Sequence, residues 1–352
     1  MFVAHAAPAV VGGTAAFLVE VPDERSRLLF AVTAGLGLGL LTGGVRIPGP
    51  EVEGRYSRGV LRRQIAIRAV CLLALGFLLQ ATGVLVYIIL DEYGVAFLIM
   101  LPFIFLPAQW LLAAGAALLV LAPGTAATLD ALVGPDNHGA LLEWFVTGAY
   151  PVFTWVAVLM IGVGIVRLDL TRRSVVAVAG TIGLVAMVGG LSLSIALGGD
   201  GIAAEPLASR GSMAAAAIGT SAFTIGNVGF CVALTMLLVG LTSPALGLPR
   251  RVTRGTTAVL APVAAAGTMP LSVYTAHVLV LVAAIHESPS GFPTDDGWPV
   301  VIGLVIGTLT LPWLWRRFVG RGPLERVIGQ LSGRVAARRT VVTPPTGNVP
   351  TP

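Results

Sequence analysis

Apolar runs of about twenty residues, separated by short polar loops, recur along the whole of this 352-residue chain. The runs at 67–83 and 174–198 are close to the length that an α-helix needs to cross a bilayer. Lipid offers no hydrogen bonds to the backbone, so a crossing segment must satisfy its N–H and C=O groups internally. Only 11% of the residues are charged, against about 25% in a typical soluble domain. The sequence therefore predicts an all-α fold, a polytopic transmembrane helix bundle of about ten helices.

The placement of arginine predicts the orientation of this bundle in a cell (plasma) membrane. All 22 cationic residues are arginine, and all but Arg25, Arg27 and Arg210 lie in or beside segments that alternate with the outer loops. Such residues are enriched in the cytoplasmic loops of membrane proteins. Because the arginines flank apolar runs, the net charge of +5 does not indicate nucleic-acid binding. The expected cytoplasmic segments are 46–68, 167–173, 250–254 and 316–339, and the expected outer loops are 124–146, 199–220 and 287–297.

Residues 1–330 are expected to form one transmembrane domain. Residues 331–352 are basic and then rich in Pro and Thr, and they lack the apolar surface that offsets the entropy of ordering, so we expect a disordered cytoplasmic tail there. The first helix is expected to be truncated. Four residues precede His5, roughly 6 Å of helix, whereas a crossing needs about 20 residues. We therefore expect the natural chain to begin about fifteen residues earlier.

Two places in the sequence are candidates for chemistry. His5 is an ionisable side chain in an apolar run, which marks a functional site by default; the alternative is that it caps a frayed terminus. In the segment 268–286, Pro270, Tyr274 and His277 follow helical spacing and share one face, which is expected to point into the bundle. The alternative there is a Tyr–His pair that only holds helices together. Glycine and proline at 267–270 are expected to break this helix.

Other polar and small residues give further expectations. Arg27 begins a helix at the outer edge, where it either holds an anion or extends toward water. Asp91 and Glu92 are adjacent, so we expect them in a solvated loop rather than as a facing acid–base pair. The glycines of the stretch 35–44 are spaced for close helix packing. No group of residues has the spacing of a metal site or of a Ser-His-Asp triad, so no metal is expected.

Several stretches resemble a known family. MFVAHAAP and SRLLFAVTAGLGLGLLTGG resemble the start of bacterial membrane proteins related to heparan-alpha-glucosaminide N-acetyltransferase. ILDEYGVAFLIMLP, GAYPVFTWVAVLMIGVGIVRLDL and GTMPLSVYTAHVLVLVAAIH are similar to later segments of the same group. WRRFVGRGPLER is also similar to YeiB-like proteins of this transmembrane acyltransferase superfamily. The resemblance covers residues 1 to about 330.

The resemblance implies an enzyme that moves an acyl group from cytoplasmic acyl-CoA, such as acetyl-CoA, to a sugar or glycolipid acceptor across the membrane. It places a functional histidine near the outer end of the first helix, which corresponds to His5, and we expect this residue to act as general base. Arg27, Tyr274 and His277 are expected to line the acceptor site. The expected ligands of the CoA phosphates are the cytoplasmic Arg62, Arg63, Arg172 and Arg173.

A transporter or exporter without covalent chemistry is the alternative, because the same polar residues would then line a path through the membrane. No internal repeat stands out in the sequence, which counts against a transporter built from inverted repeats. The two readings differ in one simple observation: an acyltransferase hydrolyses acetyl-CoA or transfers its acetyl group, whereas a transporter does neither.

Overall fold

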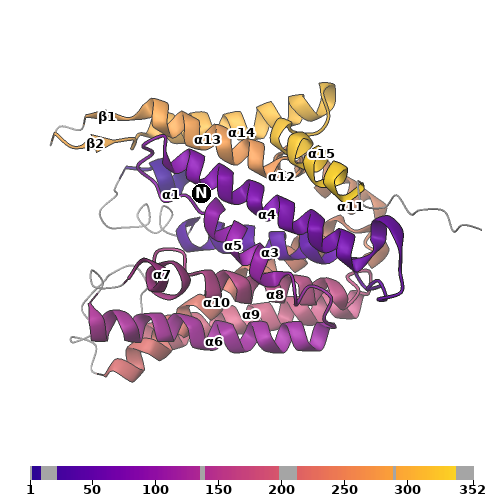
Figure 1. Ribbon diagram of the computed structural model, residues 1–352, viewed down its shortest axis with the longest axis horizontal. Helices are drawn as coiled ribbons and strands as arrows, with labels where there is room; N and C mark the ends of the chain where they lie inside the picture. The colour runs from indigo at the N-terminus through magenta and orange to yellow at the C-terminus, as the bar shows by residue number, and fades with distance from the viewer. Residues whose placement is uncertain (1, 9–21, 135–138, 198–211, 288–290, 338–352) are drawn as a thin grey trace, which may run out of the picture.

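The computed structural model is an all-helical bundle that describes residues 2–8, 22–134, 139–197, 212–287 and 291–337 (Figure 1). Apart from one two-stranded hairpin, its elements are helices and the loops that join them. Most helices run along the long axis of the molecule, with the hairpin at one end and helix α15 toward the other (Figure 1). The all-α helix bundle expected from the apolar runs is confirmed.

The described elements are as follows in chain order. The first half contains α1 (Phe2–Ala6), α3 (Pro22–Leu41), a 3-10 turn (Gly54–Tyr56), α4 (Arg58–Gln80), α5 (Leu90–Met100), α6 (Ala108–Val133), α7 (Ala140–Leu142) and a π-turn (Glu143–Thr147). The second half contains α8 (Val152–Arg167), α9 (Arg173–Ala196), α10 (Met213–Thr242), a 3-10 turn (Pro244–Leu246), α11 (Arg250–Val259), α12 (Ala261–Gly267), α13 (Pro270–Ala284), β1 (His286–Glu287), β2 (Pro293–Thr294), α14 (Trp298–Phe318) and α15 (Pro323–Ala337). The two strands are antiparallel, with His286 opposite Thr294.

Among the described residues, six helical segments are long and apolar enough to cross a membrane, so the protein is membrane-embedded. They are α4, α6, the segment Ala140–Arg167, α9, α10 and α14, and the bent pair α12–α13 makes a seventh if it counts as one span. The expected count of about ten is not confirmed. Helix α3 has too many charged residues in its first turns, and α5, with 11 residues, is too short to cross a membrane, so neither is counted as a span. Of the first helix, expected to be truncated, the structure describes α1 around His5, and residues 9–21 lie outside the described residues.

Two prolines have different effects on the helices that precede or contain them. Helix α5 ends at Met100, just before Pro102, because proline has no N–H to continue the hydrogen-bond ladder. Helix α6 instead continues through Pro123 to Val133. Transmembrane helices tolerate such a proline when neighbouring groups satisfy the freed backbone. The segment after 123 is therefore helical for a further ten residues instead of an outer loop.

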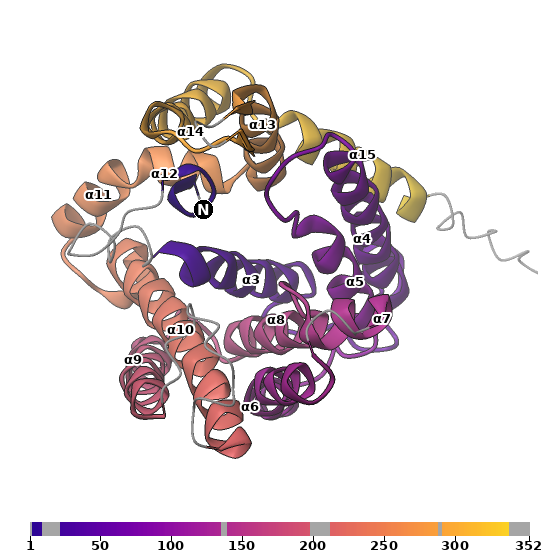
Figure 2. The same ribbon diagram turned by 90° about the vertical axis from the view of Figure 1, so that its left-hand side faces the viewer.

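Helix α8 lies at the centre of the bundle. Fourteen of its 16 residues are buried, and it packs against α3, α5 and α6. The pair α9–α10 covers one side, α4 with α15 covers another, and α12 to α14 form a third side (Figure 2). This arrangement leaves the short helix α1 between α3 and α14.

Arg167, the last residue of α8, joins the ends of three helices on the expected cytoplasmic side. Its side chain is only 7% exposed. Nη2 donates hydrogen bonds to the Thr42 hydroxyl and to the Ile104 carbonyl, both at 2.8 Å. Nη1 donates to the carbonyls of Thr42 and Gly44. Arginine is suited to this position because its five N–H groups fan out in one plane.

Helix α15 fixes the break between α12 and α13. The Glu325 carboxylate accepts hydrogen bonds from the backbone N–H of Leu271 at 2.7 Å and of Ser272 at 3.1 Å, at the first turn of α13. A carboxylate at the start of a helix accepts hydrogen bonds from the free N–H groups there and interacts favourably with the positive end of the helix dipole. Helix α15 continues to Ala337, past the domain boundary expected at 330, and the expected tail at 338–352 lies outside the described residues.

Glycines bring α3 and α8 into close contact, as the sequence predicts. A Cβ atom at Gly35 would lie 2.6 Å from the Leu159 carbonyl oxygen, and one at Gly162 would lie 2.7 Å from the Val32 carbonyl oxygen. Both approaches are to backbone atoms, which cannot rotate away. By contrast, a Cβ at Gly37 on the same helix would meet no atom within 4 Å.

We expect Gly35→Ala to lower the midpoint of thermal unfolding in detergent and to cost roughly 1–3 kcal/mol, because overpacking forces the two helices apart. Gly37→Ala is the matched control, and its expected effect is neutral or stabilising by up to about 1 kcal/mol, since alanine favours a helix over glycine. Equal unfolding midpoints for the two variants would show that the α3–α8 contact does not limit stability.

Candidate functional site

His5 and His277 are in contact, although 272 positions separate them in the sequence. His5 Nδ1 lies 3.2 Å from His277 Nε2, and the two rings stack with centroids 5.1 Å apart. His277 is only 1% exposed. A neutral imidazole offers one N–H and one acceptor nitrogen, so one ring donates to the other without either carrying a charge. The structure thus joins two of the residues that the sequence analysis selected separately.

Backbone contacts hold His5 in this position. Helix α1 packs against α14 and α3, and the Ala6 carbonyl accepts a hydrogen bond of 2.9 Å from the Gly297 N–H at the start of α14. Ala6 is fully buried in a small apolar cluster with Leu281 of α13 and Val301 of α14. The chain around His5 is therefore anchored to the α13–α14 hairpin.

The break predicted at 267–270 is confirmed, because α12 and α13 meet at an angle of 89°. Pro270 begins α13, a position where the missing N–H costs no hydrogen bond. Tyr274 and His277 are both buried on α13, with ring centroids 5.8 Å apart in an edge-to-face arrangement. The Tyr274 hydroxyl oxygen accepts a hydrogen bond of 3.3 Å from the backbone N–H of Ile89, so α13 is tied to the segment that precedes α5.

Arg27 lies against an aromatic ring. Its Nη1 donates to the Ala149 carbonyl at 3.3 Å, and its guanidinium carbon lies 5.3 Å from the centroid of the Tyr150 ring. The Tyr93 hydroxyl donates to the Arg27 carbonyl at 3.4 Å. Protein groups therefore bind and orient this cation at the expected outer end of the bundle.

One small cavity brings these residues together. His5, Arg27 and Tyr274 all line it, and its volume is about 20 Å³, enough for about one water molecule. Tyr87, another lining residue, is 73% exposed, so the cavity lies next to the protein surface. The remaining lining residues are Ser26, Phe30, Ile89 and Tyr150. Three tyrosines, one cation and one imidazole thus surround a space where a polar group of a ligand fits.

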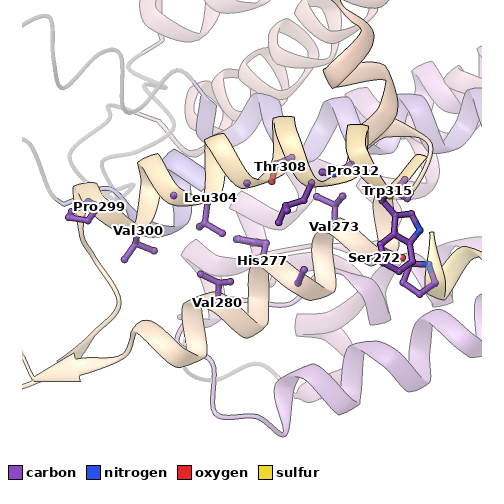
Figure 3. A pocket seen from close by; sticks show the side chains of 16 residues that line it. Ser272, Val273, His277, Val280, Pro299, Val300, Leu304, Thr308, Pro312 and Trp315 are labelled. Carbon is purple, nitrogen blue, oxygen red and sulfur yellow. The ribbon is translucent and has the colours of Figure 1, made fainter. Parts of the chain in front are cut away.

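His277 also lines a second, larger space, a groove of about 440 Å³ between α13 and α14 (Figure 3). In Figure 3, the His277 ring points from α13 toward α14, midway along the groove. The two sides of His277 therefore differ: His5 and the small cavity lie on one, and an apolar groove lies on the other.

Asp91 was misread from the sequence as a solvated loop residue. It lies in the first turn of α5, is only 4% exposed, and accepts a hydrogen bond of 2.9 Å from Gln80 Nε2. Its other oxygen, Oδ1, is buried without a hydrogen-bond partner in the described part of the chain. A Cβ at Gly76 would come within 2.7 Å of the Asp91 nitrogen, so glycine lets α5 begin directly against α4. Nothing in the local sequence shows that Gly76 lies opposite Asp91, so the burial of this acid was missed.

The four cytoplasmic arginines expected at the CoA phosphates lie in two separate places. Arg62 donates from Nε to the Leu101 carbonyl at 3.1 Å and lies over the Phe105 ring, with Arg63 beside it on α4. Arg172 pairs with Asp169 at 3.3 Å, next to Arg173 at the start of α9. Helices α4 and α9 lie on opposite sides of the bundle (Figures 1 and 2). No hydrogen bond, ion pair or ring contact within the described ranges joins the two pairs.

The loop that carries Arg172 is held by local contacts. The hydroxyl and the backbone N–H of Thr171 both donate to Asp169 Oδ1, and these hydrogen bonds, together with the nearby Arg172 charge, hold the pKa of Asp169 below its usual value. The Arg172 side chain itself is 72% exposed, so it remains accessible to an anion from the solvent.

Comparison with known proteins adds no relative to this description. Searches of protein-family models, curated proteins and solved structures return no match to the chain. The interpretation of the site therefore depends on its own geometry and on the resemblance of the sequence stretches given above.

Proposed function

We propose that this chain is a multi-pass acyltransferase of the plasma membrane, which transfers an acyl group from cytoplasmic acyl-CoA to a sugar or glycolipid acceptor on the outer side. The observation that carries the proposal is the contact of 3.2 Å between His5 and His277, beside Arg27 and Tyr274 at one cavity. A pair of neutral imidazoles, one buried and one half-buried, beside a cation suits proton transfer at neutral pH.

In the proposed reaction, His5 donates its Nδ1 proton in a hydrogen bond to His277 Nε2, which leaves His5 Nε2 as the free base. Nε2 removes the proton from the acceptor hydroxyl or amine as that group attacks the acyl carbonyl. The new ester or amide bond forms and the thioester C–S bond breaks, and CoA leaves as the thiol because His5 Nε2 returns the proton to its sulfur. The Arg27 guanidinium would stabilise the negative charge that develops on the carbonyl oxygen.

Labelled acetyl-CoA tests this proposal. Purified protein in detergent is incubated with acetyl-CoA that carries a radioactive acetyl group, together with a glycolipid extract as acceptor. The expected result is release of free CoA, with the label on acetate or on the acceptor. Acetyl-CoA that remains intact over many hours, in preparations with a folded protein, would argue against acyl transfer.

Transport without covalent chemistry is the second candidate, and one observation favours it. The span that carries Tyr274 and His277 is broken, with the bend of 89° between α12 and α13. Broken helices commonly form the substrate sites of secondary transporters, because their ends expose unpaired backbone groups. Here, however, Glu325 already caps the first turn of α13. The acetyl-CoA assay separates the two candidates, since a transporter leaves the thioester intact.

The orientation of the bundle is a separate prediction. We expect a cysteine at Glu287, in the outer hairpin, to react in intact cells with a maleimide that cannot cross membranes, and a cysteine at Glu51 to react only after the cells are opened. Both positions are exposed, and Cys71 and Cys231 are first replaced by alanine. The arginine bias motivates this expectation. Labelling of position 51, but not of position 287, in intact cells would reverse the orientation.

A further inference from the structure

The groove between α13 and α14 is apolar along its length. Of its 16 lining residues, only Ser272, His277, Thr308 and Trp315 have a nitrogen or oxygen atom in the side chain. Its volume of about 440 Å³ is far larger than the space at His5. A cavity of this size and composition in a membrane protein suits a hydrocarbon chain, because water gains no hydrogen bonds there.

The groove also runs along α14, the direction that a lipid chain beside a membrane-spanning helix would take. Its lining extends on α14 from Pro299 near the start of the helix to Trp315 near its end (Figure 3). Helix α14 has 21 residues, and at 1.5 Å per residue it is about 31 Å long, the thickness of the hydrocarbon core. It is also one of the least buried of the candidate spans. The groove therefore faces lipid and runs parallel to the lipid chains.

Three cations stand at the cytoplasmic end of this groove. Arg316 and Arg317 directly follow Trp315 on α14, and the Trp315 Nε1 donates a hydrogen bond of 3.1 Å to the Arg321 carbonyl, which holds the next loop against the groove. All three arginine side chains are exposed, and none forms an ion pair within the residues that the structure describes. A negatively charged headgroup at the end of a chain in the groove would neutralise them.

We propose that this groove binds one hydrocarbon chain of an anionic glycerophospholipid from the cytoplasmic leaflet, with the phosphate held by Arg316, Arg317 and Arg321. The chain passes His277, whose ring forms part of the groove wall and contacts His5 on its other side. A bound lipid therefore packs against His277 without entering the small cavity that His5 lines. The proposal is independent of acyl transfer, since the site binds lipid whether the protein is an enzyme or a transporter.

Two glycines allow the groove to be filled without disturbing the backbone. Gly303 and Gly307 line it, and a Cβ at Gly303 would meet no atom within 4 Å, whereas one at Gly307 would meet only Leu311 Cδ1, at 3.9 Å. Leucine at both positions fills the space and also favours the helix. Gly189→Leu is the matched control, because Gly189 is an exposed glycine of α9 with no atom within 4 Å of its Cβ position and lies outside the groove.

Native mass spectrometry tests the proposal. Delipidated full-length protein is mixed with phosphatidylglycerol or phosphatidylcholine of identical chains, and bound lipid is counted per protein. We expect one phosphatidylglycerol to bind roughly tenfold more tightly than phosphatidylcholine. Gly303→Leu/Gly307→Leu should lose this lipid and Gly189→Leu should keep it. Removing the charges of Arg316, Arg317 and Arg321 with glutamine should abolish the preference, whereas the same change at Arg250, Arg251 and Arg254 should not.

Several results would overturn the proposal. The first is that wild-type protein binds phosphatidylglycerol and phosphatidylcholine equally. The second is that Gly303→Leu/Gly307→Leu binds phosphatidylglycerol as the wild type does. The third is that the wild type binds no lipid and forms a dimer that Gly303→Leu/Gly307→Leu cannot form. If Gly303→Leu/Gly307→Leu fails to fold, Thr308→Phe is used instead, because Thr308 also lines the groove. This variant should likewise lose phosphatidylglycerol, and unchanged binding would overturn the proposal. Because no step of this assay measures acyl transfer, its outcome is separate from that of the acetyl-CoA assay.

Discussion

His5→Ala is expected to lower the rate of acyl transfer by roughly 10²- to 10⁴-fold, the contribution that a positioned general base makes. The side chain is half-buried, and the backbone around it is anchored to the α13–α14 hairpin through Ala6, so the variant should still insert and fold. The measurement is the initial rate of CoA release at saturating acetyl-CoA, with thermal unfolding as the check on folding. A rate equal to that of the wild type would end the catalytic role of His5 and favour the transporter.

His277 is expected to act through His5, so its variants serve as controls for the same experiment. His277→Ala removes the acceptor for His5 Nδ1 and should lower the rate less than His5→Ala does. His277→Gln keeps a carbonyl oxygen that can accept this hydrogen bond, and it should recover part of the rate. If His277→Gln is no better than His277→Ala, the hydrogen bond of 3.2 Å does not position the base.

Arg167→Met is expected to cause the largest loss of stability, roughly 3–5 kcal/mol, because it leaves three buried acceptors and one half-buried acceptor without their donor. These acceptors are the Thr42 hydroxyl and the carbonyls of Thr42, Gly44 and Ile104, which belong to the ends of different helices. The measurement is the midpoint of thermal unfolding, supported by the fraction of monodisperse protein after gel filtration. Arg167→Lys should rescue only part of the loss, since an ammonium group does not reproduce the planar fork of arginine.

Arg172→Ala is the control for this prediction, because it removes an arginine five positions later. Its ion pair with Asp169, at 3.3 Å, is exposed to solvent, and exposed pairs contribute about 0–1 kcal/mol. We therefore expect almost no change in the unfolding midpoint. A similar loss for Arg167→Met and Arg172→Ala would mean that the hydrogen bonds of Arg167 do not hold the helix ends together.

Much of the fold follows from the sequence, because hydrophobicity and backbone chemistry act locally. The apolar runs predicted a helix bundle, the Gly-Thr-Met-Pro stretch at 267–270 predicted the break, and the glycines at 35 and 39 predicted close packing. The number of crossings did not follow, because helix length depends on tertiary packing. Proline ended one helix near 102 and was absorbed within another at 123, and nothing local separates these two cases.

The candidate site was only partly predictable. Polar side chains are costly in lipid, and for this reason the sequence indicated His5 and the Tyr274–His277 face as two separate candidate sites. No local signal in the sequence showed that His5 and His277 touch. That contact depends on how α1 docks on the α13–α14 hairpin, which is a long-range property of the bundle. The same limitation applies to Asp91, which is buried because α5 begins directly against Gly76 of α4. It applies also to the arginines expected on the cytoplasmic side, which lie at the ends of two different helices.

Vectorial acyl transfer in proteoliposomes is the most direct test of the proposed function. Labelled acetyl-CoA is supplied on the side that carries the arginine-rich loops, and a glycolipid acceptor is placed on the other side. For the wild type, we predict covalently labelled acceptor together with an equal amount of free CoA, and for His5→Ala we predict neither. The account would be contradicted by label that crosses the membrane as intact acetyl-CoA, or by equal acceptor labelling in both proteins.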